Sequence, residues 1–408
     1  MISFEQAKEL IEKHTKPLLA EKVFLKDALG SVIAQDIRSP LPLPSFNNSA
    51  MDGFAFRSAD TARATLERPV YLKINKTVKA GDSCRMTLKS GEAFRIMTGA
   101  MIPRRANTVI PKEAATVRGA LLTFFNPFGR GKNVRYQGEE LKKGRKVLLK
   151  NAVINPGAIG FLASLGKDRI KVFGKPSVSL IATGNELVKP GRRLLHGKIY
   201  DSNSWMVSSC LEKMGLCPSF VKTLPDKPSL LRKTIGAALR KSDVVVLTGG
   251  VSAGDYDYVK TILDESGVRE IFWRVNQKPG KPIFFGRKGH VLVFGLPGNP
   301  ASVFSCFYEY VYPALRRMMG FRAPYLQNDR IPVTSDVTPD RSRTLFLKAR
   351  TTLKNNRKNV TPLKHQGSHM ISSLCQADSL IIVPPSCKPF KKGQKVMVHY
   401  LPYLKGGC

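Results

Sequence analysis

Between about residues 175 and 320, short apolar runs alternate with segments of helical periodicity, and this alternation limits the possible folds more than any other feature. The apolar runs predict buried strands, and the amphipathic segments between them predict helices. Strands are expected at residues 178–182, 219–224, 244–247, 283–285 and 291–294, and helices at residues 204–214, 229–240, 258–264 and 300–319. Such alternation is typical of a parallel sheet that carries helices on both faces.

The flanking segments have a different pattern. Ser3 and Gln6 fit a capping box at the start of an N-terminal helix, and three prolines between residues 40 and 44 predict a stiff extended linker. Residues 45–150 contain short strand-like segments between glycine turns, and polar and apolar residues alternate again after Gly320. We therefore expect a β-rich module before the α/β region and a small all-β domain, an open sheet or a barrel, after it.

Length and composition exclude several classes of protein. The chain has 408 residues, enough for two to four domains at about 150 residues each, and no apolar stretch approaches the ~18 residues that a membrane span needs. The N-terminal segment carries acids and lysines and lacks the apolar core of a signal peptide. Seven cysteines at irregular spacing, without a CxxC pair, favour reduced thiols. We expect a cytoplasmic protein with no membrane association.

The charge of the chain is unusual. Its 66 lysines and arginines exceed its 30 acids and give a formal net charge of +36, which favours binding to polyanions such as nucleic acid. However, the basic residues are spread along the whole chain and form no charged tail. Aromatic residues make up only 8%, and no RRM, zinc-finger or helix-turn-helix signature is present. A nucleic-acid or polyanion binder therefore remains an alternative.

Three glycine-bearing turns follow expected strands of the α/β region. They are residues 183–186 (TGNE), 248–257 (TGGVSAGDYD) and 295–300 (GLPGNP). In parallel α/β sheets, ligands bind outside the carboxyl ends of the strands, and glycine lets backbone N–H groups approach an anion at a helix N-terminus. Each turn alone is also compatible with a simple helix cap. Together, the three turns predict a site for phosphate or another oxyanion.

Acids are scarce, so their positions are informative. Glu186, Asp255 and Asp257 lie within these turns, and Asp201 and Asp226 follow strand ends. Carboxylates weaken anion binding unless a hard cation such as Mg²⁺ bridges them to a phosphate. The alternative is that each acid only caps a helix or forms a turn.

Residues 278–282, with the sequence KPGKP, provide the opposite charge. Its prolines and glycine restrict the backbone, so that Lys278 and Lys281 are expected to face one region. Lysine acts as a compact point charge toward an oxyanion or a phosphate. An ordinary charged surface loop is the alternative.

At this point the motifs resemble those of one family. They are residues 48–55 (NSAMDGFA), 95–100 (RIMTGA), 183–187 (TGNEL), 199–203 (IYDSN), 249–258 (GGVSAGDYDY), 278–282 (KPGKP), 296–300 (LPGNP) and 366–373 (QGSHMISS). In this order they are similar to the motifs of the MoeA family of molybdopterin molybdenumtransferases, to which the E domain of gephyrin also belongs. The match covers the chain from about residue 3 to residue 403.

The resemblance implies an activity and partners. The enzyme would insert molybdenum from molybdate into adenylyl-molybdopterin, in the presence of Mg²⁺, and release AMP. It would be a homodimer that receives its substrate from a molybdopterin adenylyltransferase of the MogA type and supplies apo-molybdoenzymes or their chaperones. No specific nucleic-acid partner and no membrane partner are implied.

The resemblance also implies an elongated, multidomain α/β plus β fold. Domain I would be discontinuous, with residues 1–44 and 147–174, and the β-rich domain II, residues 45–146, would be inserted into it. Domain III, residues 175–322, would be a MogA-like parallel α/β sheet that binds molybdopterin. Domain IV, residues 323–408, would be a small C-terminal β-barrel, and the cleft would be completed by the partner subunit.

Roles carry over from the family by motif. The implied catalytic residues are Asp52, Thr98, Glu186, Asp226 and Asp257. The implied Mg²⁺ ligands are Asp52, Glu140, Glu186 and Asp257. The implied substrate-binding residues are Gly249, Gly250, Ser252, Lys278, Lys281, Pro297, Gly298, Pro300 and Ser368.

The chain departs from the family pattern at a few positions. Glu140 stands where a Gly-Glu-Asp turn usually ends in Asp, and Asn185 replaces a frequent Asp beside Glu186. Arg104 and Arg105 lie where acidic or small residues are common. A gephyrin-like scaffold protein is a further alternative, but the chain carries no gephyrin-like linker or appended domain.

Overall fold

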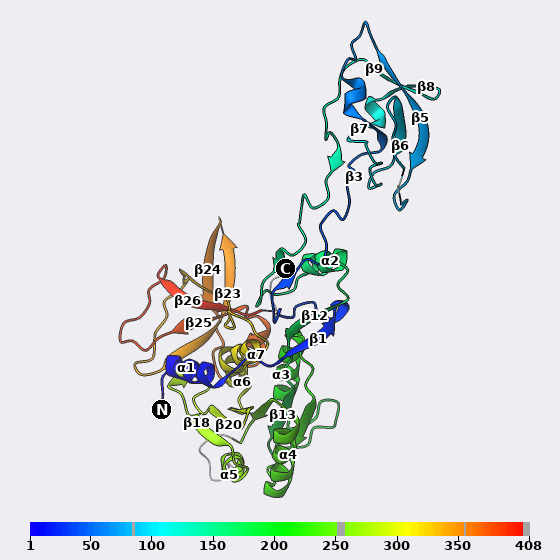
Figure 1. The fold of residues 1–408 in the computed structure, drawn as a ribbon. Coiled ribbons are helices and arrows are strands. Elements are labelled where there is room, and N and C mark those ends of the chain that lie inside the picture. The colour runs from blue at the N-terminus through cyan, green and yellow to red at the C-terminus, as the bar shows by residue number, and fades with distance from the viewer. Residues whose placement is uncertain (84–85, 251–257, 355, 403–408) are drawn as a thin grey trace. The chain divides into compact units, whose positions relative to one another are not determined.

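The structure is a computed structural model that describes residues 1–83, 86–250, 258–354 and 356–402 (Figure 1). The chain forms two compact units. The larger unit comprises Met1–Ala34, Asn151–Ile159 and Asp168–Cys408, and the smaller unit comprises Gln35–Lys150 and Gly160–Lys167. The division into four domains at the predicted boundaries stays a prediction.

A six-stranded sheet forms the centre of the larger unit. Its strands, in spatial order, are β16 (Phe220–Leu224), β13 (Val178–Thr183), β17 (Val244–Thr248), β21 (Val291–Leu296), β20 (Phe284–Lys288) and β18 (Arg269–Trp273). The first four strands run parallel, as the sequence predicts. However, β20 runs antiparallel to both of its neighbours, β21 and β18, so the sheet that the sequence predicts as parallel is mixed at this edge. Because only two residues join β20 to β21, a hairpin is the connection that fits.

Helices cover both faces of this sheet. The helices of the larger unit are α1 (Phe4–His14), α3 (Ser202–Lys213), α4 (Pro228–Lys241), α5 (Tyr258–Glu265), α6 (Pro300–Cys306) and α7 (Tyr312–Met318), while α2 (Pro156–Ser164) spans the boundary between the units. Val244 and Val246 of β17 pack in the same cluster as α3, α6 and α7, and Val245 and Leu247 pack with α4 and α5. This alternation follows from the two-residue period of a strand.

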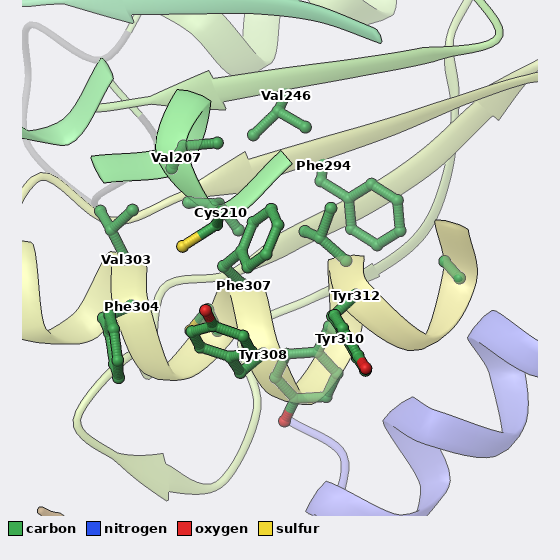
Figure 2. Packing of buried hydrophobic residues seen from close by; sticks show 14 of the residues in the cluster. Val207, Cys210, Val246, Phe294, Val303, Phe304, Phe307, Tyr308, Tyr310 and Tyr312 are labelled. Atoms are coloured by element: carbon green, nitrogen blue, oxygen red, sulfur yellow. The ribbon is translucent and has the colours of Figure 1, made fainter. Parts of the chain in front are cut away.

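Figure 2 shows the first of these faces, where Val207 and Cys210 of α3 lie over aromatic side chains from residues 304–312. Between α6 and α7, Phe307–Val311 forms a π-helical turn, so the single helix expected over residues 300–319 is interrupted. The turn buries two successive polar side chains. Glu309 is 3% exposed, and Tyr310 is fully buried.

The chain after Gly320 forms a small barrel in the larger unit. Its sheet has the order β19 (Gln277–Lys278), β23 (Thr344–Lys354), β25 (Ser379–Val383), β26 (Lys395–Tyr400) and β22 (Asn328–Pro332), and β24 (Arg357–Pro362) pairs with β23. A bridge between Val333 and Val360 joins β22 to β24 and closes the sheet. The strand β19 ends at Lys278, the first residue of the KPGKP segment, and its pairing with β23 attaches this segment to the barrel. Two short two-stranded ladders complete the larger unit: β1 (Ala20–Phe24) with β12 (Arg169–Phe173), and β14 (Leu187–Val188) with β15 (Ile199–Tyr200).

The smaller unit is β-rich, as expected. Its main sheet has the order β7 (Thr108–Pro111), β4 (Gly53–Phe56), β6 (Glu92–Ile96), β5 (Val70–Val78), β9 (Leu121–Phe124) and β8 (Thr116–Arg118). Two short ladders accompany it, β3 (Asn48–Ser49) with β10 (Val134–Arg135), and β2 (Ile37–Arg38) with β11 (Lys146–Leu148). This unit has its own core, which includes Phe56, Phe94 and Phe124. Across the described residues of both units, no helix has the length and apolar character that a membrane crossing requires.

Candidate active site

The carboxyl ends of the four parallel strands meet at one edge of the central sheet. In the strand register, Thr183 pairs with Leu224, and Thr248 pairs with Leu296. The Gly249 N–H donates a 3.1 Å hydrogen bond to the Leu296 carbonyl, which joins the second glycine turn to the third. The start of the second turn and both other turns therefore lie at the same edge, as the strand topology predicts.

One part of this edge carries two acids, Glu186 and Asp226, which we call the acidic side. The Asp226 carboxylate accepts hydrogen bonds from the Thr183 hydroxyl and, at 3.2 Å, from the Asn185 N–H. In return, the Asn185 side chain accepts from the Asp226 N–H at 3.1 Å. Asn185 thus joins two neighbouring turns and presents a neutral side-chain acceptor to the Asp226 N–H.

Glu186 lies exposed above Gly184. A Cβ atom at position 184 would lie 2.6 Å from one Glu186 carboxylate oxygen, so glycine is needed there for the carboxylate to occupy this position. The backbone carbonyl of Glu186 accepts from the Ile199 N–H at 2.9 Å, which fixes the turn. The arrangement leaves an accessible carboxylate at the carboxyl end of β13, on the same edge as the other turns.

Asp201 has a structural role. Its buried carboxylate caps helix α3, where it accepts from the Ser204 N–H at 3.0 Å and from the Thr223 hydroxyl at 2.7 Å. This matches the capping alternative for that residue. Asn203, the last residue of the IYDSN motif, donates a 2.7 Å hydrogen bond from its side chain to the Gly298 carbonyl and so ties α3 to the third turn, a role that the motif alone does not predict.

A second part of the edge is a cleft of about 420 Å³, which we call the cationic cleft. Three segments line it: KPGKP, the LPGNP turn and the barrel. The predicted residues that it brings together are Lys278, Lys281, Pro297 and Ser368. The structure adds Arg343, which sequence reasoning missed. Pro300 begins helix α6, and the next residue, Ala301, donates its N–H to the Ser368 carbonyl at 3.0 Å.

Buried side chains hold the KPGKP loop from behind. Gln277 is fully buried and donates to the Gly280 carbonyl at 3.0 Å and to the Cys306 sulfur at 3.4 Å. The Tyr310 hydroxyl, delivered by the π-helical turn, donates to the Gln277 side-chain oxygen. A Cβ atom at Gly280 would lie 2.5 Å from the Cys306 sulfur, so only glycine allows this packing. Burial raises the pKa of the Cys306 thiol far above its usual value, which keeps this support uncharged.

Arg343, which lines the cleft, forms an ion pair with Asp340. Its guanidinium donates two hydrogen bonds, of 2.7 and 3.0 Å, to one carboxylate oxygen of Asp340. These bonds, together with the Ser342 N–H, hold the pKa of Asp340 well below its usual value. Asp340 therefore stays ionised and neutralises part of the positive charge of Arg343.

Three predicted residues lie in the smaller unit. Asp52 and Thr98 are in contact, because the Asp52 carboxylate accepts from the Thr98 N–H at 2.6 Å and from the Thr98 hydroxyl at 2.7 Å. These two hydrogen bonds lower the pKa of Asp52. Glu140 is exposed, and its N–H donates to the Leu43 carbonyl at 3.1 Å. Arg104 forms a backbone bridge with Thr87, and Arg105 adopts a positive φ of 73°.

Ser252, Asp255 and Asp257 lie outside the described residues, so their predicted roles stay predictions. Within the described ranges, no group of three or more His, Cys, Asp or Glu side chains forms a ready metal site. In phosphate-binding sites Mg²⁺ is usually held by one or two carboxylates together with phosphate oxygens and water.

Family models match three stretches of the chain. The "MoeA N-terminal region (domain I and II)" matches residues 2–166, the "Probable molybdopterin binding domain" matches residues 179–317, and the "MoeA C-terminal region (domain IV)" matches residues 330–401. The second and third of these stretches contain the residues of the acidic side and of the cationic cleft.

Curated relatives and solved structures agree with these models. A Staphylococcus aureus protein named molybdopterin molybdenumtransferase is 33% identical over 395 residues, which cover 97% of this chain and 94% of that protein. A Staphylococcus epidermidis protein of the same name is 32% identical over 97% of this chain and 95% of its own length. The crystal structure of a molybdopterin biosynthesis MoeA protein from Pyrococcus horikoshii is 30% identical, covers 98% of this chain and 99% of its own, and superposes with a TM-score of 0.86.

Proposed function

The chain belongs to the MoeA family of molybdopterin molybdenumtransferases, and we propose that it binds molybdate in the cationic cleft and Mg²⁺ on the acidic side. It is an enzyme of molybdenum cofactor biosynthesis that inserts molybdenum into molybdopterin. The finer roles below are proposals for this chain.

The cationic cleft is the observation that carries the proposal. It places two lysines and Arg343 around about 420 Å³, next to the hydroxyl-bearing Ser368. Molybdate is a compact dianion, and ammonium groups with a hydroxyl donor match its charge and its oxygen acceptors. The cleft would hold the oxyanion at the carboxyl ends of the strands, next to the turns that would bind the pterin phosphate.

The acidic side fits a hard divalent cation. The exposed Glu186 carboxylate and the adjacent Asp226 offer the oxygen ligands that Mg²⁺ prefers. Asp257 is proposed as a further ligand on the family pattern. Asp52 and Glu140 are proposed separately, on the same pattern, as Mg²⁺ ligands of the smaller unit. When bound, Mg²⁺ would neutralise phosphate charge.

We propose adenylyl-molybdopterin as the substrate and AMP as the leaving group. Cleavage of a phosphoanhydride depends on positioning and charge stabilisation more than on a protein nucleophile. Lys278 and Lys281 would orient the oxyanion, while the Gly249, Gly250 and Gly298 turns would present backbone groups to the phosphate. Pro297 and Pro300 would shape the wall, and Ser252 would contribute a hydroxyl donor. Asp52 and Thr98, which are in contact within the smaller unit, are proposed as catalytic residues on the family pattern.

The partners and location are also proposals. We propose a homodimer that takes substrate from a molybdopterin adenylyltransferase and passes its product to apo-molybdoenzymes or their chaperones. A cytoplasmic location is consistent with five free cysteines among the described residues. The polyanion-binding alternative is supported only by the net charge of +36, which by itself predicts weak, salt-sensitive binding.

The test is a single-turnover assay with purified protein, adenylyl-molybdopterin, molybdate and Mg²⁺. We expect AMP release together with activation of an apo-molybdoenzyme, and loss of both in Lys281→Gln. Lys241→Gln, at the exposed C-terminal end of α4, is the matched control and should behave like the wild type. Failure of the wild type to release AMP with every component present would overturn the proposal.

A further inference from the structure

Lys348 of β23 is a buried lysine behind the wall of the cationic cleft. Its side chain is 2% exposed, and its ammonium donates to the carbonyls of Gly367 and Met370, each at 3.2 Å. Gly367 itself lines the cleft, as does Leu347, the neighbour of Lys348 in the strand. The Lys348 ammonium therefore donates a hydrogen bond directly to a residue of the cleft wall, Gly367.

The same residue anchors the loop that carries Ser368. The Lys348 N–H donates to the Gln366 side-chain oxygen at 3.0 Å, and the Gln366 amide donates to the Lys348 carbonyl at 2.8 Å. On its other side, this loop is held by the Ala301 N–H at the start of α6. Ser368 is thus fixed between the barrel and the LPGNP turn.

The charge of Lys348 has no protein counter-ion in the described part of the chain. Its ammonium donates to neutral carbonyls, and no carboxylate of the described residues forms an ion pair with it. Burial of an uncompensated ammonium is costly, and here burial lowers the pKa of Lys348. Carbonyl dipoles alone compensate only part of that cost. An anion bound on the far side of the Gly367 wall would supply the missing negative charge.

We infer that Lys348 is a positioning residue that supplies a third, buried cation to the cationic cleft and fixes the Ser368 loop, so that its charge strengthens oxyanion binding without contact. This inference rests on the proposed function of the cleft. A charge in a poorly solvated wall is screened less than one on the surface, so its effect persists in salt that weakens the exposed lysines.

The test separates charge from hydrogen bonding at position 348. Lys348→Gln keeps a donor and removes the charge, Lys348→Met removes both, and Lys348→Arg keeps both. We expect the dissociation constant for molybdate, measured by calorimetry, to rise about tenfold in Lys348→Gln and Lys348→Met. In Lys348→Arg it should stay within about threefold of the wild-type value.

Two results would overturn the inference. One is wild-type molybdate affinity in a folded Lys348→Gln, which would reduce Lys348 to a loop anchor. The other result applies if the neutral variants fail to fold. In that case a folded Lys348→Arg that binds molybdate tenfold more weakly than the wild type would contradict the proposed effect of the charge. Lys281→Gln is run in parallel. If it also binds like the wild type, the proposed cleft itself fails, whereas a loss confined to Lys281→Gln rejects only the role of Lys348.

Discussion

The loop that carries Lys278 and Lys281 packs on buried side chains, whereas the turn that carries Glu186 lies at the surface. Behind the first, Gln277, Cys306 and Tyr310 form an uncharged buried support. The second is held by backbone hydrogen bonds and by the exchange between Asn185 and Asp226. We conclude that the protein alone shapes the cationic cleft, whereas the Mg²⁺ site that we propose on the acidic side would also need ligands from the substrate.

The largest expected effect comes from removing both exposed cations of the cleft. The double variant Lys278→Gln/Lys281→Gln should bind molybdate at least about a hundredfold more weakly, because two charge-assisted hydrogen bonds contribute about 1.5–3 kcal/mol each. Calorimetric titration measures this. If the double variant binds molybdate with an affinity within threefold of the wild-type value, the cationic cleft does not bind the oxyanion.

The Glu186→Gln variant tests the acidic side. The change is isosteric, so we expect molybdate affinity to stay within about twofold. The rate of AMP release at saturating Mg²⁺ should fall on the order of a hundredfold, through loss of a cation ligand. Single-turnover kinetics over a range of Mg²⁺ concentrations check this. A Glu186→Gln enzyme with the wild-type rate and the wild-type Mg²⁺ dependence would remove the acidic side from catalysis.

Gly280→Ala probes how rigidly the KPGKP loop is supported. The added Cβ would lie 2.5 Å from the Cys306 sulfur and 2.8 Å from the Gln277 amide nitrogen, at a positive φ of 91°. We expect a loss of about 2–4 kcal/mol in the free energy of unfolding, measured by urea denaturation.

Gly289→Ala is the matched control, because it also has a positive φ, of 58°, but has open space around it. It should lose only about 1 kcal/mol. Equal losses in the two variants would mean that backbone conformation, and not packing behind the cleft, sets the cost at Gly280.

The smallest expected effect is a gain. Asp340→Asn removes the carboxylate that neutralises Arg343, so the cleft becomes more positive and molybdate should bind about two- to fivefold more tightly. Calorimetric titration at low and high salt tests whether this effect is electrostatic, because the gain in molybdate affinity should then shrink as the salt concentration rises. Weaker binding would show that Asp340 acts mainly by orienting the guanidinium.

Much of this arrangement was predictable, because it depends on local pattern. The apolar runs mark β13, β17 and β21, and parallel strands place their carboxyl ends together, which brings the turns at Thr183, Thr248 and Leu296 to one edge. The two lysines of KPGKP and Ser368 were expected at one site through the family resemblance, and the structure places all three along the cleft.

The missed features depend on contacts between segments that are distant in the chain. Arg343 reaches the cleft only because β19 pairs with β23, a register that no periodicity encodes. Similarly, the π-helical turn that buries Tyr310 is invisible to a 3.6-residue period, which predicts one continuous helix there. The reversed direction of β20 follows from the two-residue hairpin to β21, which strand–helix alternation hides.

The most direct test of the central claim is the anomalous scattering of molybdenum from a crystal soaked in molybdate. A preformed cationic cleft predicts one peak inside it, even without Mg²⁺, at a position where the oxygens around the molybdenum accept hydrogen bonds of about 3 Å from the Lys281 ammonium and the Ser368 hydroxyl. A well-occupied peak elsewhere on the protein, with none in the cleft, would contradict the account.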